Sequence, residues 1–211
     1  MTLLPLLALP WLLSPLALIR LARKTPSLEE HAAVEDGPLV SVIVPARNEA
    51  ATITTVVTSV LATSYRNVEL IVVDDRSTDA TAALVRDLAS GDARLRLISG
   101  SELPPGWYGK PWACHQGALA ATGEILLFTD ADTRHAPALL GHAVSTLRAT
   151  DTDLLTIAPE QQFLSFWERT VMPQVWLLLG LRYHPRRGKP RATRQRGDRQ
   201  RAVHHDPAGH L

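Results

Sequence analysis

Residues 68–79 read VELIVVDDRSTD, a mostly apolar run that ends in two aspartates. A run of this kind is typical of a strand that is buried on both faces of a sheet. The paired aspartates stop the strand, and the Ser-Thr-Asp stretch behind them is typical of a turn that leads into a helix. The segment predicts a buried strand with polar side chains at its carboxyl end.

Strands and helices are also expected to alternate on both sides of this segment. Further strands are expected at 39–45, 94–98 and 124–129. Helical spacing of apolar residues is found at 49–63, 78–89 and 112–121, with Ser77 or Thr78 as the cap of the second of these helices. Strands that alternate with helices at this spacing predict an α/β, Rossmann-like fold with a mostly parallel sheet. Ligands of such sheets bind outside the carboxyl ends of the strands.

Acidic residues follow three of the expected strands. The first strand ends in Pro45-Ala46-Arg47-Asn48-Glu49, the second in Asp74-Asp75, and the fourth in Asp130-Ala131-Asp132. Carboxylates that converge on one sheet edge repel one another unless cations or hydrogen-bond donors compensate them. A D-x-D after a buried strand suits Mg²⁺ or Mn²⁺, which also take oxygens from a substrate diphosphate. The alternative, that these acids are ordinary caps and turns, is the simpler interpretation of Asp79.

Three segments together resemble a known family. VSVIVPARNEAATI at 40–53, ELIVVDDRSTDAT at 69–81 and GEILLFTDADT at 123–133 are similar, in order and spacing, to family 2 glycosyltransferases with the GT-A fold. The resemblance covers roughly residues 39–181. The segments 103–114, 166–169 and 172–174 are similar to a membrane-anchored branch that includes hopene-associated and carotenoid-type enzymes. This resemblance implies transfer of a sugar, with inversion, from a nucleotide diphosphate to a lipid-like acceptor.

The resemblance also implies roles for residues. Pro45 and the turn Ala46-Arg47-Asn48-Glu49 would line the nucleotide pocket, and Asp75, with Asp74 beside it, would bind the base, typically uracil. Asp130 and Asp132 would hold Mn²⁺ or Mg²⁺ against the diphosphate. This agrees with the chemistry, because a carboxylate accepts the imide N–H of uracil and a metal neutralises the leaving diphosphate.

Four residues between the third and fourth strands allow two interpretations each. Lys110 either contacts a phosphate or is a simple exposed lysine. Trp107, Tyr108 and Trp112 either shape a sugar or lipid surface or pack the loop that contains them. The single cysteine, Cys114, is expected to be a small buried hydrophobe and not a nucleophile.

The N-terminal segment predicts a membrane anchor. Residues 2–19 carry no charge and are close to the roughly 20 apolar residues that span a bilayer. Arg20, Arg23 and Lys24 follow at once, so the positive-inside rule places the rest of the chain in the cytoplasm, at the inner membrane. A cleaved signal peptide and a buried helix are the alternatives for residues 1–24. Residues 25–38 have the composition of a linker.

The C-terminal part of the sequence changes character. Residues 163–181 are rich in Trp, Phe and Leu, which predicts either a helix at the membrane interface or an apolar hairpin of the core. Net charge is −6 over residues 1–181 and +7 over 182–211, so a nucleic-acid-binding composition of the domain is excluded. The basic tail, 182–211, is expected to be disordered, and we interpret it as the product of a reading frame lost near residue 185; a tail that binds anionic lipid or nucleic acid is the alternative.

The catalytic base cannot be located in this sequence. An inverting transferase needs a group that deprotonates the acceptor hydroxyl. In the family this group is an Asp well beyond the D-x-D, and the tail offers Asp198 and Asp206 without any surrounding motif. Two hypotheses therefore follow, an active lipid-linked sugar transferase and a C-terminally truncated fragment that binds donor and metal without turnover.

Overall fold

The computed structural model describes residues 13, 20, 27–157 and 160–182, which fall into two compact units. The larger unit, Pro26–Pro159, is a parallel α/β domain. Its strands are β1 (Val40–Ala46), β2 (Val68–Asp74), β3 (Leu95–Ser99) and β4 (Ile125–Phe128). Its helices are the short η1 (Leu28–Glu30), α2 (Ile53–Leu61), α3 (Thr81–Gly91), α4 (Gly109–Ala120) and α5 (Leu139–Thr150). The predicted alternation of strands and helices is confirmed.

The four strands lie in the order β3-β2-β1-β4, and every neighbouring pair is parallel. The chain moves from β1 outward to β2 and β3, and then crosses back to place β4 on the other side of β1. The strand order thus reverses between β1 and β4, and a reversal of this kind leaves a crevice outside the carboxyl ends of the two strands. Arg47 follows β1 and Asp130 follows β4, so both come at this point of the sheet.

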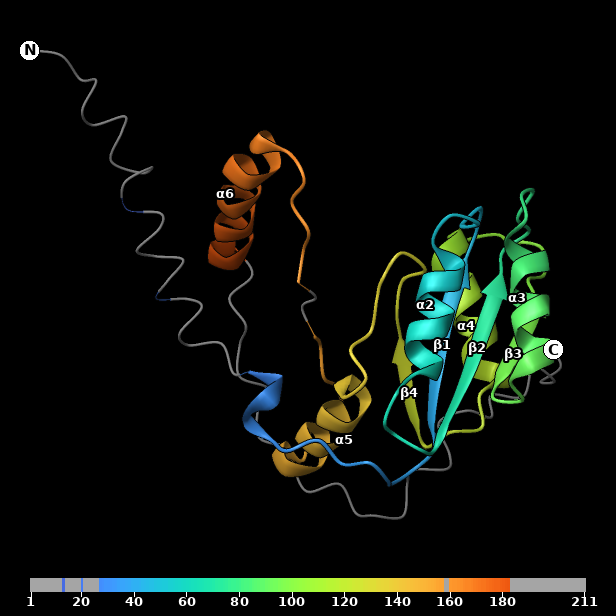
Figure 1. Ribbon diagram of the computed structural model, residues 1–211. Helices are drawn as coiled ribbons and strands as arrows, with labels where there is room; N and C mark the ends of the chain where they lie inside the picture. Colours follow the sequence, from blue (N-terminus) through green and yellow to red (C-terminus); the bar gives the residue numbers. More distant parts are fainter. Residues whose placement is uncertain (1–12, 14–19, 21–26, 158–159, 183–211) are drawn as a thin grey trace, which may run out of the picture. The chain divides into compact units, whose positions relative to one another are not determined.

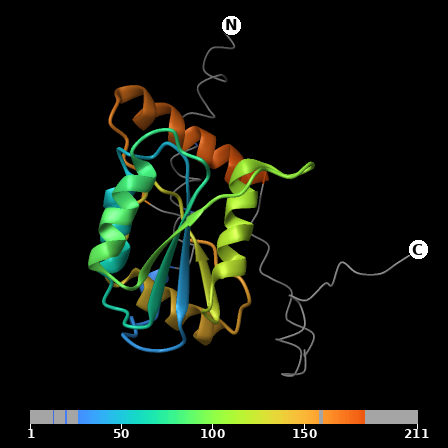
Figure 2. The same ribbon diagram turned by 90° about the vertical axis from the view of Figure 1, so that its right-hand side faces the viewer.

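Helices cover the sheet from both faces (Figures 1 and 2). Val42 and Val44 of β1 belong to the larger core cluster, which also contains residues of α2, α3 and α5, whereas Ile43 belongs to a smaller cluster with Ala113 of α4. Alternate side chains of a strand point to opposite faces, and here both faces are apolar. This explains why β1 and β2 read as continuous apolar runs and do not alternate.

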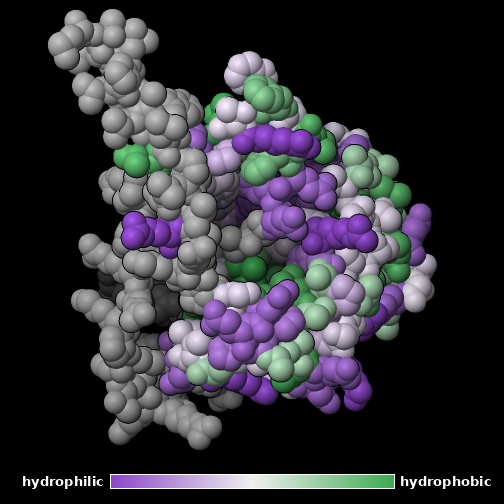
Figure 3. All heavy atoms as spheres, turned by 60° about the vertical axis from the view of Figure 1, so that its left-hand side comes forward, coloured by the Kyte–Doolittle hydropathy of each residue, from purple (hydrophilic) through white to green (hydrophobic). Residues whose placement is uncertain are grey.

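β4 forms one edge of the sheet and is less well covered. Leu126 and Phe128 are 42% and 52% exposed, and they lie in register with Ser41 and Ile43 of β1. Figure 3 shows one face of the molecule, on which hydrophobic side chains are interspersed among hydrophilic ones. β4 therefore presents partly exposed apolar side chains at the edge of the sheet.

All three predicted helices start at other residues than expected, and α2 begins at Ile53 instead of residue 49. α3 begins at Thr81 with Ala80 as its N-cap, so neither Ser77 nor Thr78 caps it. The reason is that both residues are bonded to the loop after β1: Ser77 Oγ accepts from Asn48 N, and Thr78 N donates to Asn48 Oδ1. α4 begins at Gly109 and not at residue 112, because Pro111 fits the first turn of a helix, where no backbone donor is needed.

Residues 27–38, which have the composition of a linker, belong to the larger unit and are hydrogen-bonded to the rest of it. Val34 N donates to Gly141 O, Arg66 N donates to Glu35 O, and the Tyr65 hydroxyl donates to Pro38 O. These contacts hold the segment against α5 and the start of the sheet.

The described part of the second unit contains α6 (Phe166–Arg182). It is one continuous helix with Pro173 inside it, so the hairpin alternative for 163–181 is wrong. Phe166 and Trp167 are more than 70% exposed, and the Trp176 indole donates to Gln161 Oε1. Within the described residues, no helix has the length and hydrophobicity needed to span a bilayer. The expected anchor at 1–24, apart from residues 13 and 20, and the tail at 183–211 lie outside the described residues.

Candidate functional site

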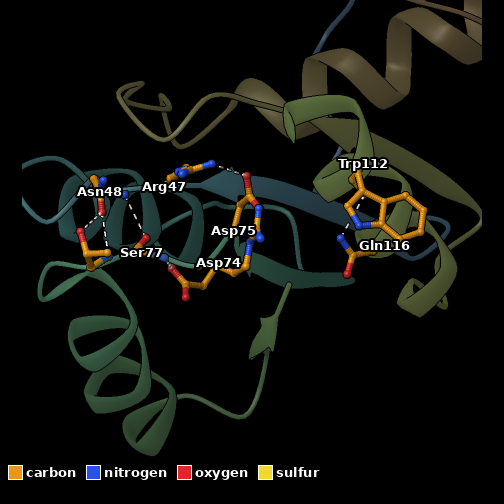
Figure 4. A network of polar contacts seen from close by, with 9 residues as sticks. Arg47, Asn48, Asp74, Asp75, Ser77, Trp112 and Gln116 are labelled. Atoms are coloured by element: carbon orange, nitrogen blue, oxygen red, sulfur yellow. Dashed lines mark hydrogen bonds and ion pairs between the residues drawn. The ribbon is translucent and has the colours of Figure 1, made fainter. Parts of the chain in front are cut away.

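The loops after β1 and β2 are bonded to each other by a row of polar contacts (Figure 4). Asn48 Oδ1 accepts from both the backbone N–H and the hydroxyl of Thr78. Glu49 N donates to Thr81 Oγ1, and Ala50 N donates to Asp79 Oδ2. Asp79 also accepts from Thr81, and these bonds lower the pKa of its carboxyl. The simple interpretation of Asp79 as a structural turn residue is supported.

Asp75 lies between two arginines. Its carboxylate oxygens are each 3.6 Å from a guanidinium nitrogen, one of Arg47 and one of Arg76. The residue is 7% exposed, while both arginine side chains are about half exposed, so the carboxylate forms the buried part of the cluster. Arg76 was not singled out by the sequence analysis. Its φ of 56° is rare for a residue with a side chain and is a signal that only the backbone gives.

Asp74 points away from this cluster, as Figure 4 shows. Its Oδ1 accepts from Ser77 N, and its carbonyl accepts from the backbone N–H groups of Arg76 and Gly100. Successive side chains of an extended chain point to opposite sides, which is why two adjacent aspartates have different surroundings. Asp74 therefore braces the turn that carries Asp75.

The N-terminal end of α4 connects the two predicted acidic positions. A side chain at Gly109 would begin 3.1 Å from Asp75 Oδ2, so only glycine leaves this approach open. The next residue, Lys110, lies in the first turn of the helix, not in the loop where it was expected, and its Nζ is 2.6 Å from Asp130 Oδ1. This bond raises the pKa of Lys110. Asp75 and Asp130 thus lie at the same edge of the sheet, with the start of α4 between them.

Asp130 and Asp132 extend from the turn after β4. The Asp130 side chain is 57% exposed, Asp132 is exposed, and Ala131 between them is buried in the core. Exposed carboxylate oxygens are suitable ligands for Mg²⁺ or Mn²⁺, and the bond to Lys110 shows that the site already attracts a cation. Within the described residues, no group of three or more acidic, His or Cys side chains lies close enough together to hold a metal ion.

The other residues that were predicted to line a nucleotide pocket support the backbone of this edge. Pro45 and Ala46 are the last two residues of β1, paired in register with Val73 and Asp74. Ala46 O accepts from Asp75 N. The Glu49 carboxylate accepts from the Thr52 hydroxyl beside the start of α2. Of these turn residues, Arg47 forms an ion pair with an acidic residue of the candidate site, Asp75.

Of the aromatic residues, Trp107 and Tyr108 lie in the loop before α4, which Figure 2 shows, and Trp112 lies in the helix itself. Trp107 and Trp112 pack edge to face with ring centroids 5.1 Å apart, and the His115 ring lies within 5.5 Å of both. Tyr108 is 80% exposed. Two of the three aromatics thus pack the loop, and Tyr108 remains available for a ligand. Cys114 is half-buried, and burial raises the pKa of its thiol, in agreement with a packing role.

Comparison with known proteins gives one family. The model described as glycosyl transferase family 2 matches residues 41–209. The 4,4'-diaponeurosporenoate glycosyltransferase of Staphylococcus haemolyticus is 39% identical over 44% of this chain and 24% of its own length. The GalNAc(5)-diNAcBac-PP-undecaprenol beta-1,3-glucosyltransferase of Campylobacter jejuni is 32% identical over 52% of this chain and 33% of its own.

A solved structure also matches. It is mannosyltransferase PcManGT from Pyrobaculum calidifontis in complex with GDP-Man and Mn²⁺, with a TM-score of 0.53 and 32% identity. The match covers 68% of this chain and 42% of that one. This chain therefore spans well under half of the length of these relatives.

Proposed function

Because the chain belongs to glycosyl transferase family 2, we propose that it transfers a sugar, with inversion, from a nucleotide diphosphate sugar to a lipid-like acceptor. One observation carries the proposal: Arg47, Asp75, Lys110 and Asp130 meet at the carboxyl edge of the sheet, where the strand order reverses. A buried carboxylate beside paired cations and exposed carboxylates is suited to a ligand that has both a hydrogen-bonding base and a charged diphosphate.

Donor binding is assigned to the β1 and β2 ends of this edge. Asp75 would accept the imide N–H of a base, uracil in a UDP-sugar, while Pro45 and the residues from Ala46 to Glu49 line the pocket. Arg47 and Arg76 each place a guanidinium nitrogen 3.6 Å from the Asp75 carboxylate and so compensate its charge. Asp74 supports Asp75 through the turn that ends at Ser77.

Diphosphate binding is assigned to the β4 end. Asp130 and Asp132 would hold Mn²⁺ or Mg²⁺, which supplies neutralisation of the diphosphate as it leaves. Mannosyltransferase PcManGT, of similar fold, was solved with Mn²⁺. Once Asp130 has a metal as its counter-ion, the Lys110 ammonium is free to donate to a phosphate oxygen instead. Lys110 then changes partner within the site.

The acceptor class rests on the relatives and on α6. Two relatives have names that include a carotenoid acid and an undecaprenol-linked glycan. The exposed Phe166, Trp167 and Trp176 of α6 suit the interface of a bilayer. With residues 1–24 as a single-pass anchor, the domain would face the cytoplasm at the inner membrane.

The donor site is tested by binding of UDP-glucose and GDP-mannose to the full-length chain, with and without Mn²⁺. We expect binding to depend on Mn²⁺, and Asp132→Ala to weaken it about tenfold or more because one of two metal ligands is lost. Asp87→Ala, at an exposed position on α3, is the matched control and should bind as the wild type does. If Asp132→Ala binds equally well, the D-x-D does not hold the metal.

The variant Lys110→Ala tests separately the ion pair of Lys110 with Asp130 and its proposed hydrogen bond to a phosphate. Mn²⁺ alone should bind a few-fold more tightly, since the ammonium no longer competes for Asp130. UDP binding without metal should weaken by about threefold to tenfold, since a charge-assisted hydrogen bond to phosphate is lost. Arg86→Ala on α3 controls for the change in net charge. Weakened UDP binding with an unchanged affinity for Mn²⁺ would mean that the ion pair between Lys110 and Asp130 does not weaken metal binding.

Transfer itself is tested with polyisoprenoid and glycolipid acceptors in detergent. Release of UDP or GDP that exceeds donor hydrolysis and depends on the acceptor supports the transferase. Tight donor binding without such release supports the second hypothesis, a donor-binding chain without turnover. Absence of donor binding in the wild type contradicts both.

A further inference from the structure

The turn that carries Asp130 and Asp132 is anchored at both ends. At its start, Thr129 N donates to Ile43 O of β1, 3.1 Å away. At its end, His135 N donates to the Ser59 hydroxyl of α2, 3.0 Å away. The buried Ala131 fixes the middle of the turn in the core. The two exposed carboxylates thus extend from a segment that is fixed at its start, its middle and its end.

A row of side-chain hydrogen bonds crosses this turn. His135 Nε2 lies 3.0 Å from Thr129 Oγ1, and Thr129 Oγ1 lies 3.0 Å from Thr133 Oγ1. Thr133 Oγ1 in turn donates to Asp130 O at 2.8 Å. The row therefore begins at His135 and ends on the backbone of the first candidate metal ligand.

The hydrogen bonds of this row can be donated in one direction only. A carbonyl only accepts, so the single proton of the Thr133 hydroxyl is directed to Asp130 O. Thr133 Oγ1 must then accept from Thr129, and Thr129, whose one proton is used, must accept from His135. His135 is accordingly the tautomer with its proton on Nε2. Its Nδ1 is buried and has no partner among the described residues, in agreement with an imidazole that is neutral.

We propose that His135 is a positioning residue that, as the neutral Nε2–H tautomer, fixes the turn carrying Asp130 and Asp132 for a divalent cation through Thr129 and Thr133. The proposal rests on the metal role given to these aspartates above. His135 is 8% exposed, so a proton on Nδ1 would place an unpaired charge in the core. Burial lowers the pKa of His135, which keeps the ring neutral at physiological pH.

The proposal is tested without turnover by measuring how tightly the full-length chain binds Mn²⁺ in the presence of UDP. Binding is measured as the loss of the EPR signal of free Mn²⁺. His135→Leu fills the volume but has no donor, and it should bind Mn²⁺ about tenfold more weakly. His135→Gln can place an amide N–H near the position of Nε2 and should restore most of the affinity. A merely structural histidine would not be rescued in this way.

Two threonine variants complete the test. Thr133→Val removes the link to Asp130 and should weaken Mn²⁺ binding as much as His135→Leu, with little further loss when the two are combined. Thr146→Val, which removes a buried hydroxyl of α5, is the matched control and should leave Mn²⁺ affinity unchanged. Equal Mn²⁺ affinity in the wild type, His135→Leu and Thr133→Val overturns the proposal.

The tautomer is measured separately, from the ¹⁵N shifts of the His135 ring. A protonated Nε2 at neutral pH is the expected result, and a protonated Nδ1 overturns the proposal whatever the metal does. If the wild type takes up no Mn²⁺ with either UDP or GDP, the metal role of Asp130 and Asp132 fails, and the positioning role of His135 fails with it. A wild type that binds Mn²⁺ while His135→Leu binds equally well refutes the positioning role alone.

Discussion

Two residues of the site, Asn48 and Arg76, have the same backbone angle, a φ of 56°, for different reasons. Asparagine tolerates this left-handed conformation, and the Asn48 side chain is also bonded to Thr78. Arginine has no such tolerance, and its side chain faces Asp75. Strain held in a residue that faces a candidate site indicates that the side chain has a use there.

Substitution by glycine should therefore have opposite effects at the two positions. Arg76→Gly relieves the strain and should raise the free energy of unfolding by about 1 kcal/mol. It should also weaken binding of a UDP-sugar, because one of the two cations beside Asp75 is lost. Urea unfolding and donor titration measure the two effects.

Asn48→Gly is the matched variant with the same φ. It has no strain to relieve and loses the acceptor for Thr78, so the free energy of unfolding should fall by about 1 kcal/mol. If both variants change stability in the same direction, strain at Arg76 is not the reason for the difference.

The sequence could predict which residues gather at the sheet edge, because parallel strands place their carboxyl ends together. Arg47, Asp75 and Asp130 follow from that rule alone. The pairing of Lys110 with Asp130 and the hydrogen-bond row that begins at His135 depend on side-chain conformations and on contacts between distant segments. No periodic pattern encodes such contacts.

Among the elements, α4 packs closely against the sheet. A side chain at Gly117 would overlap Ile43 Cγ2 and would come within 3.1 Å of Val73 Cγ2. Glycine here permits close approach of the helix to β1 and β2. The position matters for the site, because the same helix carries Gly109 and Lys110.

Gly117→Ala should move α4 away from the sheet. The overlap should cost about 1–3 kcal/mol of unfolding free energy, although alanine by itself favours a helix by about 1 kcal/mol. Displacement of Lys110 from Asp130 should accompany the loss, visible as weaker UDP binding. Thermal and urea unfolding give the stability change.

Gly91 at the end of α3 supplies the control, since nothing lies within 4 Å of the place where a side chain would begin. Gly91→Ala should be neutral or stabilising by up to about 1 kcal/mol. A Gly117→Ala protein as stable as Gly91→Ala would show that the helix and sheet can adjust at no cost.

The helix starts show where local sequence signals were insufficient. Ser77 and Thr78 have the composition of an N-cap, but their polar atoms bond to the loop after β1, and α3 begins later without a side-chain cap. Tertiary contacts replaced the local signal here. The strands were predicted to within a residue or two, because continuous apolar runs depend on the whole sheet and not on one cap.

At the scale of the whole domain, a buried histidine and a partly buried glutamate link stability to pH. His135 has its pKa lowered by burial from an ordinary value of 6.5. Burial alone would raise the pKa of Glu69, but hydrogen bonds from Ser41, Thr122 and Gly123 outweigh it and hold the pKa below its ordinary value of 4.5. In both cases the unfolded chain binds a proton at a higher pH than the folded chain does.

The free energy of unfolding should therefore fall in two stages as the pH is lowered. The His135 contribution is complete above about pH 6.5 and is lost below it, as the unfolded ring takes up a proton that the folded ring does not. The Glu69 contribution is lost below about pH 4.5, as the carboxyl in the unfolded chain takes up a proton that the folded carboxyl does not. Each group can contribute a slope of at most about 1.4 kcal/mol per pH unit.

Urea unfolding from about pH 7.5 to pH 4 should show the first stage reduced in His135→Gln and the second reduced in Glu69→Gln, because glutamine does not titrate. Since other histidines titrate over the same range, the difference between wild type and variant is the decisive quantity. Parallel curves for wild type and His135→Gln between about pH 7.5 and pH 5.5 would mean that the imidazole is not buried in its neutral form.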